Sequence, residues 1–269
     1  MVKKNDFKIF IIHNREARVN ELIQTLLRCK NKFYDFKIEE IYIQELRIFK
    51  FYHLVYFKMV QTKAIINWNK YLLKKIKPKQ VCEILVQIFK LLISRNFFNL
   101  FHNKISIIDS ISRKHFEALS NFLNSDSKFM LVLESDAIIP DKKNFNSALI
   151  KIMNFGKGHE GIFAVMGNSY TLEKLGAENI TYRIVDGLRI YDKPLTNTLV
   201  AYVLDRTAAS IIKNRIGNYS AWLPYLPYDW LINWVFCQID SSAESIIGIE
   251  ILDTCVIHGS ISGITKSWQ

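Results

Sequence analysis

The stretch from Phe129 to Asp136, Phe-Met-Leu-Val-Leu-Glu-Ser-Asp, constrains the fold more than any other part of the chain. Its five consecutive apolar residues, 129–133, predict a strand buried on both faces, as in the centre of an α/β sheet. Two carboxylates, Glu134 and Asp136, follow at once. Because alternate residues of an extended chain point the same way, both can face one target at the carboxyl end of the strand, where α/β sheets bind ligands.

A paired carboxylate in this position suits a hard divalent cation that already carries a diphosphate. Mg²⁺ and Mn²⁺ prefer a few carboxylates together with phosphate oxygens and waters. The alternative is a strand that becomes polar only because it reaches solvent. An isolated E-x-D pair is common and does not decide between the two.

The length and composition indicate a folded, intracellular protein. With 269 residues, of which 49% are hydrophobic, the chain can bury a sizeable core. We expect a single domain over residues 1–269. The start of the chain does not resemble a signal peptide, and no window reaches the length of a membrane span. The four cysteines are scattered without a CxxC pair, which favours reduced thiols and a cytoplasmic location.

The net charge of +11 comes from one segment of the chain. Between Leu46 and Cys82 there are nine basic residues and no acidic ones, which leaves 27 of the 36 basic residues against 25 acidic residues elsewhere. A protein that grips nucleic acid through its core fold spreads basic charge around its cleft. The basic segment also lacks any recognised binding module, so we expect no nucleic-acid partner.

The order of expected elements follows the α/β pattern. A strand at 8–12 leads into a turn with Arg15 and Arg18, which can meet a base or diphosphate, or can simply be solvated. No GxGxxG motif is present. The apolar patterns predict further strands at 36–43, 162–166, 182–185, 188–191, 198–204 and 249–257, and helices at 19–27, 112–124, 145–155, 206–214 and from about 230 to 238.

The block from 47 to 101 carries the lysine excess, many aromatic residues, one proline (Pro78) and no glycine. Helical spacing of its apolar residues predicts two or more helices broken near Pro78. Cationic aromatic helices suit the surface of an anionic membrane. An insertion that packs its apolar face on the main domain fits equally well, and the same apolar faces offer a homodimer interface.

Two further candidate site residues lie in the last third of the chain. Asp229 lies in an aromatic, proline-bearing loop that ends at Trp230, and His258 opens a His-Gly-Ser sequence. Each has an ordinary structural explanation, since an aspartate can cap the helix that follows and a single histidine is usually structural. The aromatic residues around Asp229 can stack on sugar faces or belong to the core.

Taken in order, these motifs resemble the family 25 glycosyltransferases, a group that includes lipopolysaccharide-modifying enzymes and collagen galactosyltransferases. The similarity covers residues 7–30 and about 103–263, and the block 47–101 has no counterpart in it. The matching segments are Ile9 to Arg18, Leu131-Val-Leu-Glu-Ser-Asp-Ala137, Thr198 to Leu204 with Ala208 and Ala209, Pro227-Tyr-Asp-Trp230 and His258-Gly-Ser260. Two positions depart from the family pattern: Ser135 replaces the middle Asp of the acidic motif, and Ser112-Arg113 stands where members often carry Ser-His.

The resemblance implies a GT-A-like fold and a metal-dependent transfer of a hexose from a nucleotide sugar, UDP-galactose or a similar UDP-hexose. The acceptor is a bacterial surface glycan or glycolipid such as lipopolysaccharide, which places the protein at the inner face of the membrane. Mn²⁺ or Mg²⁺ is expected on Asp136 and His258. The donor is expected on Arg15, Arg18, Glu134 and Ser260. Asp229 is the expected base of an inverting transfer. The alternative is a non-catalytic relative that binds a glycan or partner, with Ser135 marking a degenerate metal site.

Overall fold

The computed structural model describes residues 6–13, 16–30, 34–43, 50–71, 82, 86, 90, 94–167, 181–191, 194, 196, 199–217, 226–239, 245–253 and 255–259. Two of the expected donor-binding residues, Arg15 and Ser260, lie outside this part of the chain. So do the expected helix break at Pro78 and the lysines at 74–79, so the membrane-surface prediction stays a prediction.

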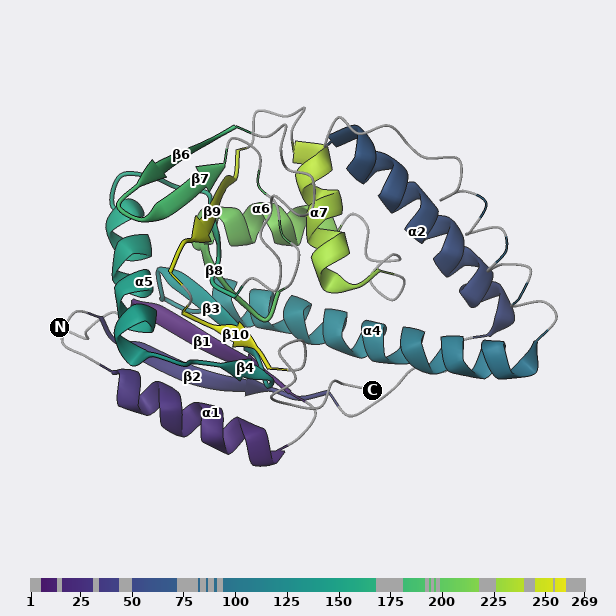
Figure 1. Ribbon diagram of the computed structural model, residues 1–269, viewed down its shortest axis with the longest axis horizontal. Helices are drawn as coiled ribbons and strands as arrows, with labels where there is room; N and C mark the ends of the chain where they lie inside the picture. Colours follow the sequence, from purple (N-terminus) through teal and green to yellow (C-terminus); the bar gives the residue numbers. More distant parts are fainter. Residues whose placement is uncertain are drawn as a thin grey trace.

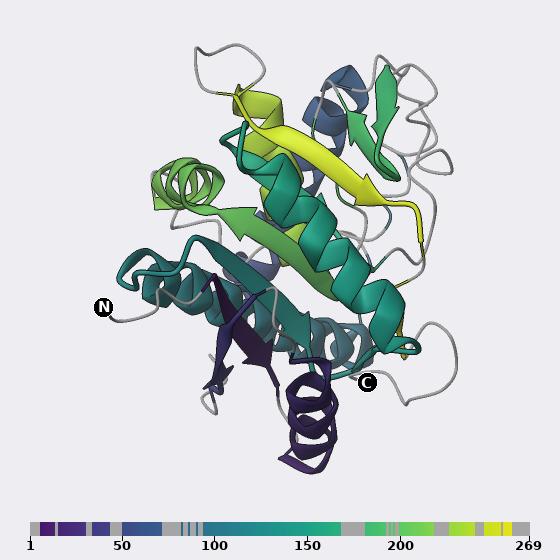
Figure 2. The ribbon, with the colours of Figure 1, turned by 90° about the vertical axis from the view of Figure 1, so that its left-hand side faces the viewer.

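An eight-stranded mixed sheet forms the centre of the molecule, in the order β2-β1-β3-β8-β5-β9-β7-β6 (Figures 1 and 2). The α/β class expected from the sequence is confirmed. The strands are β1 (Phe7–Ile12), β2 (Phe36–Ile41), β3 (Phe129–Glu134), β5 (Ile162–Val165), β6 (Tyr182–Val185), β7 (Leu188–Tyr191), β8 (Ala201–Asp205) and β9 (Ile247–Ile251). A separate two-stranded ribbon pairs β4 (Ala137–Ile138) with β10 (Ile257–His258).

Helices cover both faces of the sheet. They are α1 (Glu16–Cys29), α2 (Phe51–Tyr71), α4 (Arg95–Leu123), α5 (Lys142–Phe155), α6 (Arg206–Gly217) and α7 (Tyr228–Ile239). Alternate residues of each central strand point to opposite faces. Phe10, Met130 and Val132 therefore join α2, α4, α6 and α7 in one buried cluster. Ile9 and Leu131 belong to the other cluster, with α1 and α5.

The expected central strand is confirmed as β3. It pairs in parallel with β1 and antiparallel with β8, and its residues Met130 to Leu133 are 0% exposed. The register places Ile12 opposite both Ile41 and Glu134. Three parallel strands therefore end at one level, and Glu134 marks this edge of the sheet.

The helix expected at 112–124 is much longer than its predicted span. α4 begins at Arg95 and runs for 29 residues, and the hydroxyl of Ser94 caps its start by accepting a hydrogen bond from the backbone N–H of Phe97. The face of α4 that packs on the core carries polar as well as apolar residues. Ser112, His115 and Phe122 are buried with Leu119, whereas Phe116 and Leu123 are only partly buried. The apolar periodicity identifies the helix, and the buried polar residues interrupt its apolar stripe.

Outside α4, most of the boundaries expected from the sequence hold within a few residues. In α1, Val19, Leu22 and Leu26 are buried, whereas Leu27 is 49% exposed. The strand expected at 198–204 begins later, at Ala201. Both short strands of the expected β6–β7 pair are present.

The helix α2 packs into the main core. Leu54, Phe57, Val60 and Ala64 are buried in the same cluster as the sheet residues. The Phe57 ring meets Phe101 of α4 edge-on at 5.3 Å. In Figure 1 the first part of α4 projects past the sheet toward α2, and α2 continues alongside α7. The packing alternative for the block 47–101 therefore holds for α2. Among the helices that the structure describes, none combines the length and apolar character that a membrane crossing requires.

If α2 belongs to the cooperative core, Phe57→Ala will cost the chain about 3–5 kcal/mol of unfolding free energy, the usual cost of emptying a buried phenylalanine site. Urea denaturation followed by circular dichroism measures this loss. The matched control is Met59→Ala on the same helix, which is 59% exposed and should change stability by less than about 0.5 kcal/mol. Equal, small effects of the two substitutions would show that α2 is energetically separate.

Candidate functional site

The ribbon of β4 and β10 brings His258 to the end of β3. After β3 the chain turns through Ser135, whose backbone N–H donates to the Ile12 carbonyl at 2.8 Å, and then enters β4. His258 lies opposite Ala137 in the ribbon, and the N–H of Gly259 donates to the Asp136 carbonyl at 2.9 Å. Residues more than a hundred positions apart in the chain are thus held side by side by backbone pairing.

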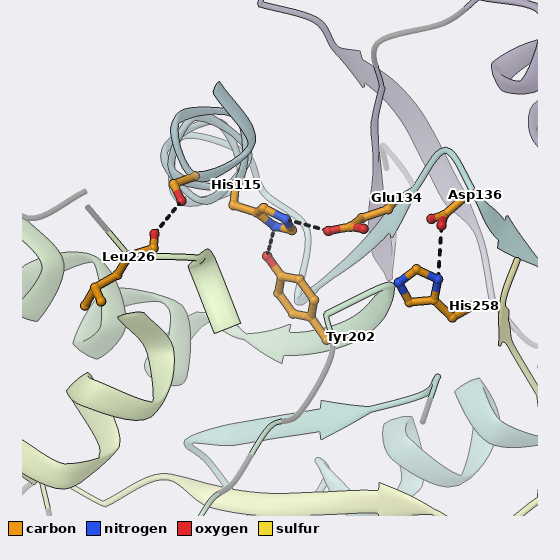
Figure 3. A network of polar contacts seen from close by, with 7 residues as sticks. His115, Glu134, Asp136, Tyr202, Leu226 and His258 are labelled. Carbon is orange, nitrogen blue, oxygen red and sulfur yellow. Dashed lines mark hydrogen bonds and ion pairs between the residues drawn. The ribbon is translucent and has the colours of Figure 1, made fainter. Parts of the chain in front are cut away.

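Glu134, Asp136 and His258 form a cluster at this edge. Their potential ligand atoms all lie within 4.8 Å of one another, and His258 Nδ1 is 3.0 Å from Asp136 Oδ2 (Figure 3). The two carboxylates suit Mn²⁺ or Mg²⁺, and an imidazole is an acceptable though less favoured ligand for Mn²⁺. Ligands of one cation at ~2.1 Å lie between ~3 and ~4.2 Å apart, so the cluster fits such an ion after small side-chain rotations.

His115 of α4 contacts the cluster through Glu134. Its Nε2 lies 3.2 Å from Glu134 Oε1 and its Nδ1 lies 3.0 Å from the hydroxyl of Tyr202 (Figure 3). The Tyr228 ring stacks on the imidazole at a centroid distance of 4.2 Å and an angle of 6°. Partners of this kind orient the groups that bind a metal and tune their basicity. His115 therefore fixes the direction in which Glu134 points.

The start of α7 is anchored to the same helix. The hydroxyl of Ser112 donates to the Leu226 carbonyl at 3.1 Å, and Tyr228 is held by its stacking on His115. Asp229 follows in the first turn of α7. Of the aromatic residues expected around it, Tyr228 is a core residue at 3% exposure and Trp230 is 37% exposed. Trp222 and Tyr225 lie outside the described residues.

Burial dominates the electrostatics of Asp229. The side chain is partly exposed at the wall of a cavity, but desolvation raises the pKa of its carboxyl to about 7. The backbone N–H of Trp230 acts in the opposite direction, and the negative charge of Glu134 adds to the rise. Asp229 thus changes its charge near neutral pH, as a general base requires.

The pKa of His258 is also shifted. Burial lowers it, but the hydrogen bond and charge of Asp136, with the charge of Glu134, outweigh burial and raise the pKa above its usual value. Without a bound cation, the imidazole is therefore biased toward its protonated form, which complements the two carboxylates.

Two separate hollows border this site. One, of about 180 Å³, is lined by Glu134, Asp229 and His258 together with His115 and Tyr228. The other, of about 490 Å³, lies along α1 and β4 and is lined by Arg18, Ser135 and Asp136. The fold thus brings Asp136 and His258 into contact and places Glu134, His258 and Asp229 around one cavity. Arg18 shares a cavity with Asp136 and not with Asp229.

Sequence reasoning missed two buried polar residues of α4. His115 is one. The other is Lys114, which is 0% exposed and donates from Nζ to the His13 carbonyl at 3.0 Å, beyond the end of β1. Burial, with a smaller effect of Arg113, lowers the pKa of Lys114 to about 8. The available signal was the Lys-His pair within an amphipathic helix, where inward polar residues interrupt the apolar stripe.

A scan against protein-family models finds no match for this chain, and a search of curated proteins also finds none. The resemblance to the family 25 glycosyltransferases therefore rests on the motifs of the sequence. The mixed α/β sheet is compatible with a GT-A-like fold.

The raised pKa of Asp229 makes a prediction about stability. Between about pH 4 and pH 7 the folded carboxyl keeps a proton that the unfolded one releases. Its contribution to stability is therefore complete below the unfolded pKa and is lost as the pH rises through about 7. We expect the unfolding free energy of Asp229→Asn, relative to the wild type, to rise by roughly 1–3 kcal/mol from pH 4 to pH 8, with allowance for partial exposure.

Urea denaturation of both proteins at several pH values measures this difference. The control is Asp126→Asn, which removes an exposed carboxyl. The difference in unfolding free energy between this variant and the wild type should be the same at each pH. A pH-independent difference for Asp229→Asn would show that its carboxyl is not desolvated.

Proposed function

We propose that this protein is a metal-dependent glycosyltransferase that moves a hexose from a nucleotide sugar, a UDP-hexose, to a hydroxyl of a bacterial surface glycan. One observation carries the proposal. Glu134, His258 and Asp229 come from three separate segments of the chain and line a single cavity, while Asp136 touches His258 at 3.0 Å. Carboxylates for a cation and a separate carboxylate for a proton are the two requirements of such a transfer.

The first requirement concerns the leaving group. Cleavage of the bond between the sugar and the diphosphate develops negative charge on the departing phosphate. Asp136, His258 and Glu134 would hold a Mn²⁺ or Mg²⁺ ion, which would supply Lewis-acid stabilisation of that charge. The guanidinium of Arg18, which lines the same hollow as Asp136, adds positive charge. With about 490 Å³, this hollow lies in the range of ~300–1,000 Å³ that is common for pockets of drug-sized ligands.

The second requirement concerns the acceptor. A hydroxyl oxygen of the acceptor forms a bond to the anomeric carbon as the bond from that carbon to the diphosphate breaks, and the hydroxyl proton must leave. Asp229, with its pKa of about 7, takes this proton at a carboxylate oxygen. The sugar is transferred with inversion, and the nucleoside diphosphate leaves with the electron pair of the broken bond.

A second candidate function is binding of a glycan or a partner without catalysis, as in a non-catalytic relative of the transferases. The observation in its favour is Ser135, a residue without a carboxylate at the middle of the acidic motif, whose side chain is also buried at 7% exposure. Substitution Asp136→Ala separates the two functions. A biological role that survives this substitution supports the non-catalytic relative, and one that is lost supports the transferase.

The cluster of Glu134, Asp136 and His258 predicts cation-dependent binding of UDP. Isothermal titration with UDP should show binding that requires Mn²⁺ or Mg²⁺. His115→Phe removes a partner of a metal ligand and should weaken the affinity for UDP by roughly 10–100-fold. Asp136→Asn removes a ligand itself and should weaken this affinity by at least as much. The control Asp126→Asn changes an exposed carboxylate elsewhere and should leave the affinity unchanged. Failure of UDP and of every UDP-hexose to bind, with or without metal, would refute the transferase proposal.

The base makes a separate prediction. Asp229→Asn should lower the rate of hexose transfer by roughly 10²–10⁴-fold while UDP still binds, because the substitution removes a proton acceptor and no metal ligand. In the wild type the rate should rise with pH and level off above about 7, since only the ionised carboxylate accepts a proton. Hydrolysis of UDP-hexose or its transfer to a glycan acceptor can be followed by UDP release. A rate that falls over this pH range would exclude Asp229 as the base.

A further inference from the structure

A third cavity lies between α2 and α7. It has a volume of about 180 Å³, and its lining includes Trp68 of α2 and Asp229, Trp230 and Trp234 of α7. Three of the five tryptophans of the chain thus meet in one small space with one carboxylate. In Figure 1 the two helices run beside each other at this place.

Asp229 is shared by this cavity and the one that contains Glu134 and His258. The carboxylate therefore stands in the wall between the proposed transfer site and the tryptophan cavity. A ligand held among the tryptophans would have the Asp229 carboxylate within its binding site. The same carboxylate also lines the cavity that contains Glu134 and His258. The cavity between α2 and α7 thus lies beside the carboxylate that is proposed to take the acceptor's proton.

The chemistry of the lining favours a sugar ring. A pyranose has apolar C–H faces that pack on aromatic rings, and hydroxyl groups around its edge that donate to a carboxylate. About 180 Å³ is below the ~300–1,000 Å³ of pockets that hold drug-sized ligands. The space therefore suits one ring and not a nucleotide.

We propose that the cavity between α2 and α7 is the acceptor subsite and holds one pyranose ring of the acceptor glycan, with Asp229 directed at its hydroxyl. This inference rests on the proposed transferase function and extends it to the acceptor. It also gives a role to α2, which belongs to the segment without a counterpart in the resembling family. The tryptophans bind the faces of the ring, and α2 selects the acceptor.

The packing of α2 holds the cavity in shape. The thiol of Cys237 on α7 lies 3.9 Å from the carbonyl of Asn67 on α2. The ammonium of Lys63 lies 5.8 Å from the ring centroid of Trp234. Ala64, beside the cavity, is 7% exposed and belongs to the main core. The tryptophan walls are therefore supported from both helices before any ligand binds, which lowers the ordering cost of binding.

Tryptophan fluorescence of the full chain tests the proposal, with methyl β-D-galactopyranoside and methyl α-D-glucopyranoside as probes in the presence of Mn²⁺ and UDP. We expect a saturable change in emission with at least one glycoside. Trp68→Ala and Trp230→Ala should each weaken the affinity about tenfold, whereas Trp230→Phe, which keeps a ring, should stay within about twofold. The control is Tyr56→Ala, which removes an aromatic side chain on α2 that is 42% exposed and should have no effect.

The outcomes separate this inference from the proposed function. No saturable response to either glycoside, or equal affinity in Trp68→Ala and the wild type, overturns the acceptor subsite. A response to 1-octanol but to neither glycoside also overturns it and identifies an apolar pocket. If the glycosides bind but UDP does not, the sugar site stands and the transferase fails. If UDP binds with Mn²⁺ and the tryptophan substitutions change nothing, the transferase stands and the acceptor subsite fails.

Discussion

The burial of β3 on both faces is the constraint on which the rest of the structure depends. Four successive residues of this strand are 0% exposed, so the strand cannot accept a polar side chain before it reaches the edge of the sheet. Glu134 is the first residue beyond that limit. It lies opposite Ile12, which in turn lies opposite Ile41, so three strands end at the same edge. The chemistry of the site is concentrated at the end of β3 because the buried part of this strand excludes polar side chains.

The helix α4 connects this edge to the other helices. Three of its buried polar residues each meet a partner in a different element: Ser112 bonds to Leu226 before α7, Lys114 to His13 after β1, and His115 to Glu134 of β3. A buried polar group left without a partner costs ~1–3 kcal/mol. The three contacts together therefore tie the strand ends and the start of α7 to one rigid helix. The same residues that interrupt the apolar stripe of α4 thus position the site.

The parts of the fold that local patterns determine were predictable from the sequence. The apolar run of β3 and the acidic pair after it indicated both the strand and its edge, and most other elements followed from periodicity. The contact between Asp136 and His258 was predicted only through a resemblance to known motifs. It depends on pairing of β4 with β10, two residues each, and strands this short leave no periodic signal. The start of α4 was missed although no proline or glycine separates residues 95–111 from 112–123. His115 was missed because its partners are distant in the chain.

The two explanations of Asp229, helix capping and catalysis, can be weighed by their magnitudes. A carboxylate in the first turn of a helix is stabilised by ~0.3–1 kcal/mol, which lowers its pKa by less than one unit. The pKa instead rises from 3.8 to about 7, a change of roughly 4 kcal/mol before any allowance for partial exposure. Burial therefore outweighs the helix terminus several-fold. A carboxylate that served only as a helix cap would stabilise the helix while exposed to solvent, without the cost of desolvation. The position of Asp229 in α7 is compatible with capping, but its enclosure between two cavities is not explained by it.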